Sequence, residues 1–228
     1  MDAGSIGFGV VSTALVLFMT PGLAFFYGGL VRAKSVISMM MMSFGAIGLV
    51  GVLWVLYGYN MSSVDSPLAF AGNPFSDFGL SALATGATAN VDLVGVAFGA
   101  TFAIITTALI SGAIADRAKF GAWMVFAAVF ATLVYFPVAA WVWGGGWAYS
   151  LGGLMGLPDV IDYAGGTAVH INAGAAALAL TFVLGSRVVF KKGAHKPHNV
   201  PFVILGASIL WFGWFGFNVG AEWTNGME

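Results

Sequence analysis

The sequence predicts an all-α polytopic membrane protein with six transmembrane helices. Composition is the first observation: 60% of the 228 residues are hydrophobic and only 7% are charged, whereas a soluble globular chain carries about 25% charged residues. So few charges cannot cover a water-facing surface, and the mean hydropathy of +0.94 agrees with a surface that faces lipid. Six apolar segments, and the distribution of basic residues between them, are the other two observations.

Each predicted span has about the 20 mostly apolar residues, or more, that a helix needs to cross a bilayer. The alternation of apolar and polar residues that is typical of a membrane barrel does not occur. The first apolar segment is too long for a signal peptide and is expected to span the membrane. We find no linker, so the sequence predicts one transmembrane domain over residues 1–228, with spans at about 6–31, 37–59, 93–115, 121–142, 166–184 and 200–220.

Basic residues predict the orientation of the spans. All eight fall in the first, third and fifth connections: Arg32, Lys34, Arg117, Lys119, Arg187, Lys191, Lys192 and Lys196. The second and fourth connections carry aspartates instead: Asp65, Asp77, Asp92, Asp159 and Asp162. Because basic residues are enriched in cytoplasmic loops, we expect the odd connections in the cytoplasm and the N-terminus outside the plasma membrane; chance sorting is the alternative.

The charge balance and the absence of cysteine exclude some functions. A formal net charge of −1 argues against nucleic-acid binding. With no cysteine in the sequence, disulfides and thiol chemistry are excluded. His195 and His198 lie in the basic fifth connection and are expected to be solvated or to bond within loops.

His170 is the exceptional ionisable residue of the spans. It lies in the fifth apolar segment, where an ionisable side chain is costly and often marks a functional site. Both nitrogens of imidazole can hydrogen-bond, and its pKa lies near neutrality. His170 is therefore a candidate for a proton-linked or hydrogen-bonding role, and the alternative is a structural histidine bonded to a neighbouring helix.

Asp162 precedes the same span and is followed by Gly165 and Gly166, which can adopt unusual backbone angles. Its carboxylate can accept backbone N–H groups at the start of the helix, or the hydroxyl of Thr167. Both possibilities favour a scaffold role for Asp162. The alternative is a ligand for a transported ion.

Two aromatic segments stand out, at 98–102 and 211–220. Most aromatic side chains of a membrane bundle lie in its core or face lipid. The second segment is denser, and its glycines at positions 213, 216 and 220 are expected to expose ring faces on one side. Such faces hold small cations by cation–π attraction.

Several motifs resemble one family. The segment 162–174 (DYAGGTAVHINAG) is similar to the signature of the ammonium transporter, methylammonium permease and Rhesus glycoprotein family, and is closest to its ammonium transporter branch. The resemblance continues in PGLAFFYGGL (21–30), WGGG (143–146), KPHN (196–199) and WFGFN (214–218). These motifs occur in order and cover essentially the whole chain.

The resemblance implies an eleven-helix fold of two inverted five-helix repeats, of which this chain is the N-terminal part: the first repeat plus the sixth helix. It implies that Phe102 and Phe217 are stacked rings that close the pore externally and that Trp143 belongs to an external recruitment site. His170 resembles the first of two pore histidines whose rings share a hydrogen bond. The remaining matches are pore-lining or vestibule positions (Ile105, Leu109, Tyr27) and entrance-stabilising ones (Asp162, Thr167, Gly165, Gly166). Ala221 departs from the serine that is common in the family.

The function implied is transport of ammonium or ammonia, with methylammonium as an analogue, by a homotrimer in the lipid bilayer. A cytoplasmic PII-type signalling protein is an implied partner, and no cofactor or metal is expected. An external aromatic site attracts the cation, deprotonation avoids carrying a bare charge through an apolar lumen, and His170 binds ammonia or relays the proton.

Three alternatives compete with transport. One is an ammonium sensor that does not transport. Another is an intramembrane enzyme, but the sequence has neither a metal-binding His pair nor a serine nucleophile elbow, so we expect no enzyme. The third is a truncated, non-conducting product. Because a pore between inverted repeats has a wall from each, we expect residues 1–228 alone not to form a sealed, conducting monomer.

Overall fold

The computed structural model describes residues 3–187, 190 and 196–225. Of residues 223–225 it describes the backbone alone. In this part of the chain every regular element is a helix and none is a strand. Six helical rods are long and apolar enough to cross a membrane: Ala3–Leu30, Ala33–Met61, Ala89–Ile114, Phe120–Val142, Gly166–Leu184 and Val200–Glu222. The predicted all-α class with six candidate spans is confirmed.

Most rods consist of an α-helix joined to a shorter turn of different pitch. The α-helices are α1 (Ala3–Leu30), α2 (Val36–Leu53), α3 (Tyr59–Met61), α4 (Ser81–Thr85), α5 (Ala89–Ile110), α6 (Phe120–Phe130), α7 (Phe136–Val142), α8 (Leu151–Leu154), α9 (Asn172–Leu184), α10 (Val200–Trp214) and α11 (Gly220–Asn225). The 3₁₀ segments are η1 (Ala33–Ser35), η3 (Phe78–Leu80) and η4 (Ser111–Ile114), and the π-helical turns are η2 (Trp54–Gly58), η5 (Ala131–Tyr135), η6 (Gly166–Ile171) and η8 (Phe215–Val219).

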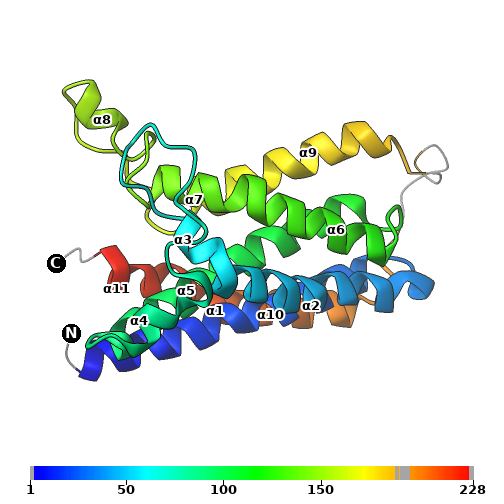
Figure 1. Ribbon diagram of the computed structural model, residues 1–228. Coiled ribbons are helices and arrows are strands. Elements are labelled where there is room, and N and C mark those ends of the chain that lie inside the picture. The colour runs from blue at the N-terminus through cyan, green and yellow to red at the C-terminus, as the bar shows by residue number, and fades with distance from the viewer. Residues whose placement is uncertain (1–2, 188–189, 191–195, 226–228) are drawn as a thin grey trace.

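The rods run roughly alongside one another, with both ends of the chain, α4 and α8 at the left of Figure 1. The C-terminal ends of α1 and α9 lie at the opposite end. Helix α5 is largely buried, whereas α9 and α10 leave most of their length exposed. The core therefore forms around α5, and the His170 side of the bundle is open.

Helices α1 and α10 approach each other closely because glycines line their contact. A Cβ added to Gly206 would lie 2.2 Å from the backbone nitrogen of Phe26. Cβ atoms on Gly213 and Gly216 would lie 2.6 Å from the carbonyl oxygen of Leu15 and 2.7 Å from that of Ser12. These glycines let the backbones pack closely, the usual role of small residues between helices in lipid. The expectation that the glycines at 213, 216 and 220 expose ring faces on one side stays a prediction.

Each of the four π-helical turns carries a ring side chain of the candidate functional site. Trp54 comes from η2, Tyr135 from η5, His170 from η6 and Phe217 from η8. A π turn inserts one extra residue into a helix and often occurs at a functional site. In this bundle the turns change the register of four rods at the level where the candidate site forms.

The second connection contains η3 and α4. The Asp77 carboxylate accepts the backbone N–H groups of Ala82 and Leu83, each at 2.9 Å. These bonds hold the pKa of the Asp77 carboxyl below its ordinary value of 3.8. The Asn60 amide donates to the Asp77 carbonyl at 2.9 Å and so ties the segment to α3.

Candidate functional site

A cavity of about 840 Å³ lies among α5, α7 and the two connections that carry aspartates. Phe98 and Phe102 from α5 line it, together with Trp143, Asp162 and Ala221. Further residues of its lining, Trp54 and Tyr135, come from π turns and were not predicted as site residues. The cavity thus combines aromatic faces with a carboxylate.

A chain of ring contacts leads from the cavity to His170. Trp143 meets Phe102 edge to face, with ring centroids 5.8 Å apart. Phe102 stacks on Phe217 at 4.3 Å and an interplanar angle of 17°. Phe217 in turn meets His170 at 6.0 Å and 84°. Phe102 and Phe217 are only 4% and 2% exposed. Phe102 is among the described residues that line the cavity, whereas Phe217 and His170 are not. The stacked pair therefore separates the cavity from His170.

The orientation of Trp143 is fixed by a hydrogen bond. Its indole Nε1–H donates to the backbone carbonyl of Asp162 at 2.7 Å, while 36% of its surface stays exposed. The Trp143 ring is therefore held by a hydrogen bond at Nε1 while part of its apolar surface stays accessible. Ala221 lies in the same lining and offers no hydroxyl.

Asp162 organises the start of η6. The carboxylate is 7% exposed; its Oδ1 accepts the N–H of Gly165 at 2.7 Å, and its Oδ2 accepts those of Thr167 and Ala168 at 2.9 Å. Thr167 therefore contributes its backbone N–H to this carboxylate. Gly165 has φ +93°, a left-handed conformation that favours glycine, and Gly166 begins the π turn. This geometry favours the scaffold interpretation of Asp162.

His170 is exposed on the open side of the bundle. Its Nδ1 lies 3.1 Å from the Gly165 carbonyl oxygen, so its described partner is a backbone group rather than the second histidine that the resemblance implies. The ring also stacks on Trp214 at 5.9 Å and 27°. Trp214 was not predicted as a site residue, although its motif WFGFN had been recognised.

Two of the remaining predicted site residues, Ile105 and Leu109, lie further along α5, and the third, Tyr27, lies in α1. Ile105 is buried, one turn beyond Phe102. Leu109 follows one turn later, and its backbone carbonyl accepts the Tyr27 hydroxyl at 2.9 Å. Of the predicted residues, Phe102, Trp143 and Asp162 line the cavity, whereas Tyr27 and Leu109 form a separate hydrogen-bonded pair.

Comparison with known proteins decides the family. The model of the Ammonium Transporter Family matches residues 7–227. This chain belongs to the ammonium transporter family. An ammonium transporter of Mycobacterium tuberculosis is 53% identical over 243 residues, which cover 98% of this chain and 51% of that protein.

Solved structures agree with this family. Saccharomyces cerevisiae Mep2 is 33% identical with a TM-score of 0.83, and the match covers 98% of this chain and 50% of Mep2. A structure titled "Sensor Amt Protein" is 26% identical with a TM-score of 0.84, covering 96% of this chain and 55% of that one. The chain thus spans about half the length of these members of the ammonium transporter family.

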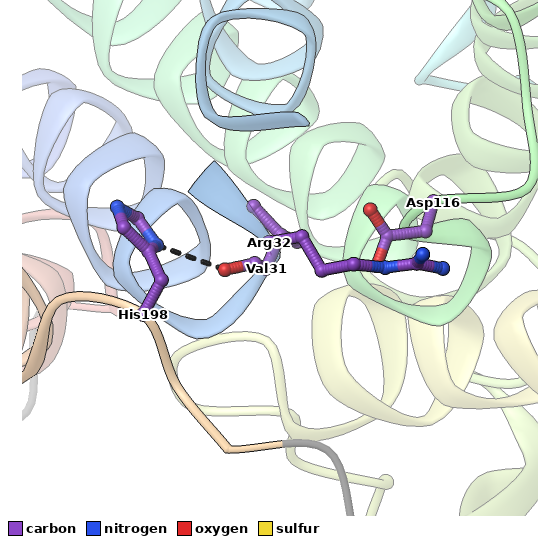
Figure 2. A network of polar contacts seen from close by, with 4 residues as sticks. All are labelled: Val31, Arg32, Asp116 and His198. Carbon is purple, nitrogen blue, oxygen red and sulfur yellow. Dashed lines mark hydrogen bonds and ion pairs between the residues drawn. The ribbon is translucent and has the colours of Figure 1, made fainter. Parts of the chain in front are cut away.

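Polar contacts join the first, third and fifth connections, which carry the basic residues (Figure 2). His198 donates from Nδ1 to the Val31 carbonyl at 2.8 Å, and the Nε of Arg32 lies 3.8 Å from Oδ2 of Asp116. The Asp116 side chain is 5% exposed and its φ is +63°. His198 thus bonds to a loop carbonyl, one of its two expected states, whereas His195 lies outside the described residues.

Within the described residues, no group of three or more His, Cys, Asp or Glu side chains can hold a metal ion. The side chains gathered at the cavity include aromatic rings, the buried carboxylate of Asp162, the exposed carboxylate of Asp65, and amide, hydroxyl and small residues. Such a set can attract a small cation and exclude water beyond the rings.

Proposed function

We propose that this chain forms the external ammonium site and part of the conduction path of an ammonium transporter. One observation carries the proposal: the stacked rings of Phe102 and Phe217 lie between an aromatic cavity and a histidine. Cation recruitment, a barrier to charge and a hydrogen-bonding group follow one another in that order.

The cavity accounts for recruitment of the cation. Ammonium rests against the faces of Phe98, Phe102 and Trp143, where cation–π attraction contributes about 0.5–2 kcal/mol per favourable contact. Water in the cavity keeps the ion partly solvated. With Ala221 in place of serine, water supplies the hydrogen-bond acceptor that a hydroxyl would offer.

The ring pair accounts for selection. Moving a bare charge past two buried phenyl rings costs several kcal/mol, so ammonium leaves its proton to the water of the cavity and passes as ammonia. His170 then accepts a hydrogen bond from the neutral molecule. Potassium has a similar size but no proton to lose, so it meets the full barrier.

We also propose that the basic end faces the cytoplasm and that the N-terminus lies outside the plasma membrane. Cysteines introduced at Ser62 and Ser186 test this orientation with a membrane-impermeant thiol reagent on intact cells. We expect labelling of Ser62→Cys only. Labelling of Ser186→Cys alone reverses the assignment.

Assembly and regulation follow from the family resemblance as further proposals. We propose a homotrimer, which native mass spectrometry of the purified chain in lipid tests. A cytoplasmic PII-type signalling protein is the proposed partner of the end that carries Arg32, Lys34 and Lys119, and co-purification from native cells tests it.

Ammonium titration of the chain in lipid nanodiscs, followed by tryptophan fluorescence, tests recruitment. Trp143→Leu removes one ring face, so the half-saturating ammonium concentration is expected to rise roughly 2- to 30-fold. Trp147→Leu is the matched control, because Trp147 is similarly exposed but does not line the cavity. Equal effects of the two substitutions contradict the proposed site.

A sensor is the second candidate function, supported by the similarity to the structure titled "Sensor Amt Protein". A sensor shares the recruitment site but needs no net flux. Deletion of the gene for this chain in its native cells distinguishes a transporter from a sensor. Reduced methylammonium uptake supports transport, whereas unchanged uptake together with ammonium binding by the purified chain supports a sensor.

A further inference from the structure

Glu222 places a carboxylate at the end of the sixth rod. No other residue between positions 200 and 222 is ionisable, and an ionisable side chain in a span is costly and often functional. The Glu222 side chain is half-buried. Within the described part of the chain, the one ion pair joins Arg32 to Asp116, so no described basic side chain neutralises Glu222. Its negative charge can therefore act on a mobile cation.

A hydrogen bond connects this carboxylate to the cavity. The Tyr163 hydroxyl donates to Oε2 of Glu222 at 2.5 Å. Tyr163 lines the cavity, and so does Ala221, the residue that precedes Glu222. An ionised carboxylate only accepts, so the phenol must keep its proton to make this bond. The same bond raises the pKa of the Tyr163 hydroxyl above its ordinary value of 10.0, and the donor therefore stays protonated at neutral pH.

We infer that Glu222 is an anionic group that attracts ammonium to the cavity, and that Tyr163 transmits its charge to the cavity wall. The inference rests on the proposed function and adds a charged residue to the aromatic faces of that site. A hydroxyl that donates to a carboxylate is polarised by it, since hydrogen bonds in a chain strengthen one another. A cation beside Tyr163 is attracted by the polarised phenol oxygen and by the carboxylate behind it.

The fourth connection holds Tyr163 near the aromatic faces. The preceding residue, Asp162, accepts the Trp143 indole N–H at its backbone carbonyl, at 2.7 Å. On the other rod, Ala221 lies about one helical turn beyond Phe217, a member of the stacked ring pair. The phenol and the carboxylate are thus attached to neighbours of the rings on both sides. Coulomb attraction falls with distance, so a charge placed here favours a cation at the rings over neutral ammonia.

Two other carboxylates line the cavity and are less suited to this role. Asp162 directs its two oxygens to three backbone N–H groups, which already stabilise its charge. Asp65 is exposed, so water and salt screen its charge. Glu222, in contrast, is half-buried and its described hydrogen-bond partner belongs to the cavity wall. It is therefore the carboxylate best placed to act on a bound cation.

The composition of the chain permits a direct measurement on the unmodified protein. Its only glutamates are Glu222 and Glu228, so carbon-13 in glutamate carboxyls labels two groups. Infrared difference spectra of the full chain in nanodiscs compare ammonium chloride with N-methylglucamine hydrochloride at equal ionic strength. We expect ammonium to shift the labelled carboxylate band, because a cation beside Tyr163 alters the bond to Glu222. The shift should persist in Glu228→Gln.

Titration with ammonium, followed by tryptophan fluorescence, measures the contribution of the charge to binding. Glu222→Gln removes the charge but keeps an acceptor for the Tyr163 hydroxyl. It should raise the half-saturating ammonium concentration roughly three- to tenfold, the effect of one partly screened unit charge near the cation. Asp65→Asn is the matched control, because it removes an exposed charge from the same cavity, and its effect should stay below about twofold.

An unshifted carboxylate band, in a sample whose fluorescence responds to ammonium, overturns the inference even if Glu222→Gln does not fold. An unchanged midpoint in a folded Glu222→Gln variant also overturns it and leaves a bond with a structural role only. Equal effects of Glu222→Gln and Asp65→Asn overturn it in favour of a diffuse negative field. Any of these results together with binding that depends on Trp143 leaves the proposed function intact, whereas wild-type binding that does not depend on Trp143 contradicts both.

Discussion

Replacing Asp162 with alanine should be among the most damaging single changes at the cavity. The carboxylate is nearly buried and accepts three backbone N–H groups at 2.7–2.9 Å. Hydrogen bonds to a charged group contribute about 1.5–3 kcal/mol each. Water from the adjoining cavity can reach the freed N–H groups and offset part of the loss, so we expect a cost of about 3–4 kcal/mol.

Asp162→Asn provides an intermediate case, because one acceptor oxygen remains, and we expect a cost of roughly 2 kcal/mol. The control is Asp159→Ala, whose carboxylate is exposed and accepts one long bond; its cost should stay below about 0.5 kcal/mol. Reversible unfolding in mixed detergent micelles, followed by circular dichroism, measures all three. Similar stabilities of Asp162→Ala and Asp159→Ala would show that the three bonds to the Asp162 carboxylate do not stabilise the fold.

Three other changes test separate parts of the fold. Gly206→Ala should cost roughly 1–3 kcal/mol, because its Cβ would meet the Phe26 backbone, whereas Gly48→Ala, with open space around it, should be neutral or stabilising in the same unfolding assay. Because the pKa of Asp77 is lowered in the folded protein, its carboxylate stabilises the loop above pH 3.8, and this stabilisation is lost as the pH falls through the lower folded-state pKa. Amide hydrogen exchange in α4 should therefore become faster in acid. In Asp77→Asn, exchange in α4 should no longer show this dependence on pH beyond the intrinsic one. Asp116→Asn should cost roughly 0.5–1 kcal/mol and Asp116→Ala about 1–2 kcal/mol more, because asparagine tolerates a positive φ better; equal unfolding midpoints would argue against backbone strain there.

Hydropathy was sufficient to predict the rods, because a segment buried in lipid must be both long and apolar. It could not predict the four π turns, since the extra residue in each depends on packing between rods. Trp54 and Tyr135 were missed for this reason: both follow ordinary apolar sequence and reach the cavity through η2 and η5. The close packing of α1 against Gly206, Gly213 and Gly216 could not be predicted, because the sequence does not reveal which helices are neighbours.

The site was predicted through family resemblance rather than through spacing. Phe102 and Phe217 are far apart in sequence, and nothing local to either indicates that their rings stack. The Asp162 bonds were anticipated because an aspartate before a helix commonly accepts its first N–H groups. In contrast, the bond between His170 and Gly165 depends on a left-handed glycine and a π turn together, and neither is visible in the sequence alone.

On the proposed function, the ring pair and its cavity pass ammonia while rejecting bare cations. Uptake of methylammonium and of rubidium, a potassium tracer, should be compared in native cells that carry the wild-type gene, a deletion or Phe217→Ala at its own locus. We expect deletion to lower methylammonium uptake without changing rubidium uptake, and Phe217→Ala to reduce the discrimination between the two ions. Unchanged methylammonium uptake after deletion, or an equal reduction in the uptake of methylammonium and rubidium, would contradict this proposal.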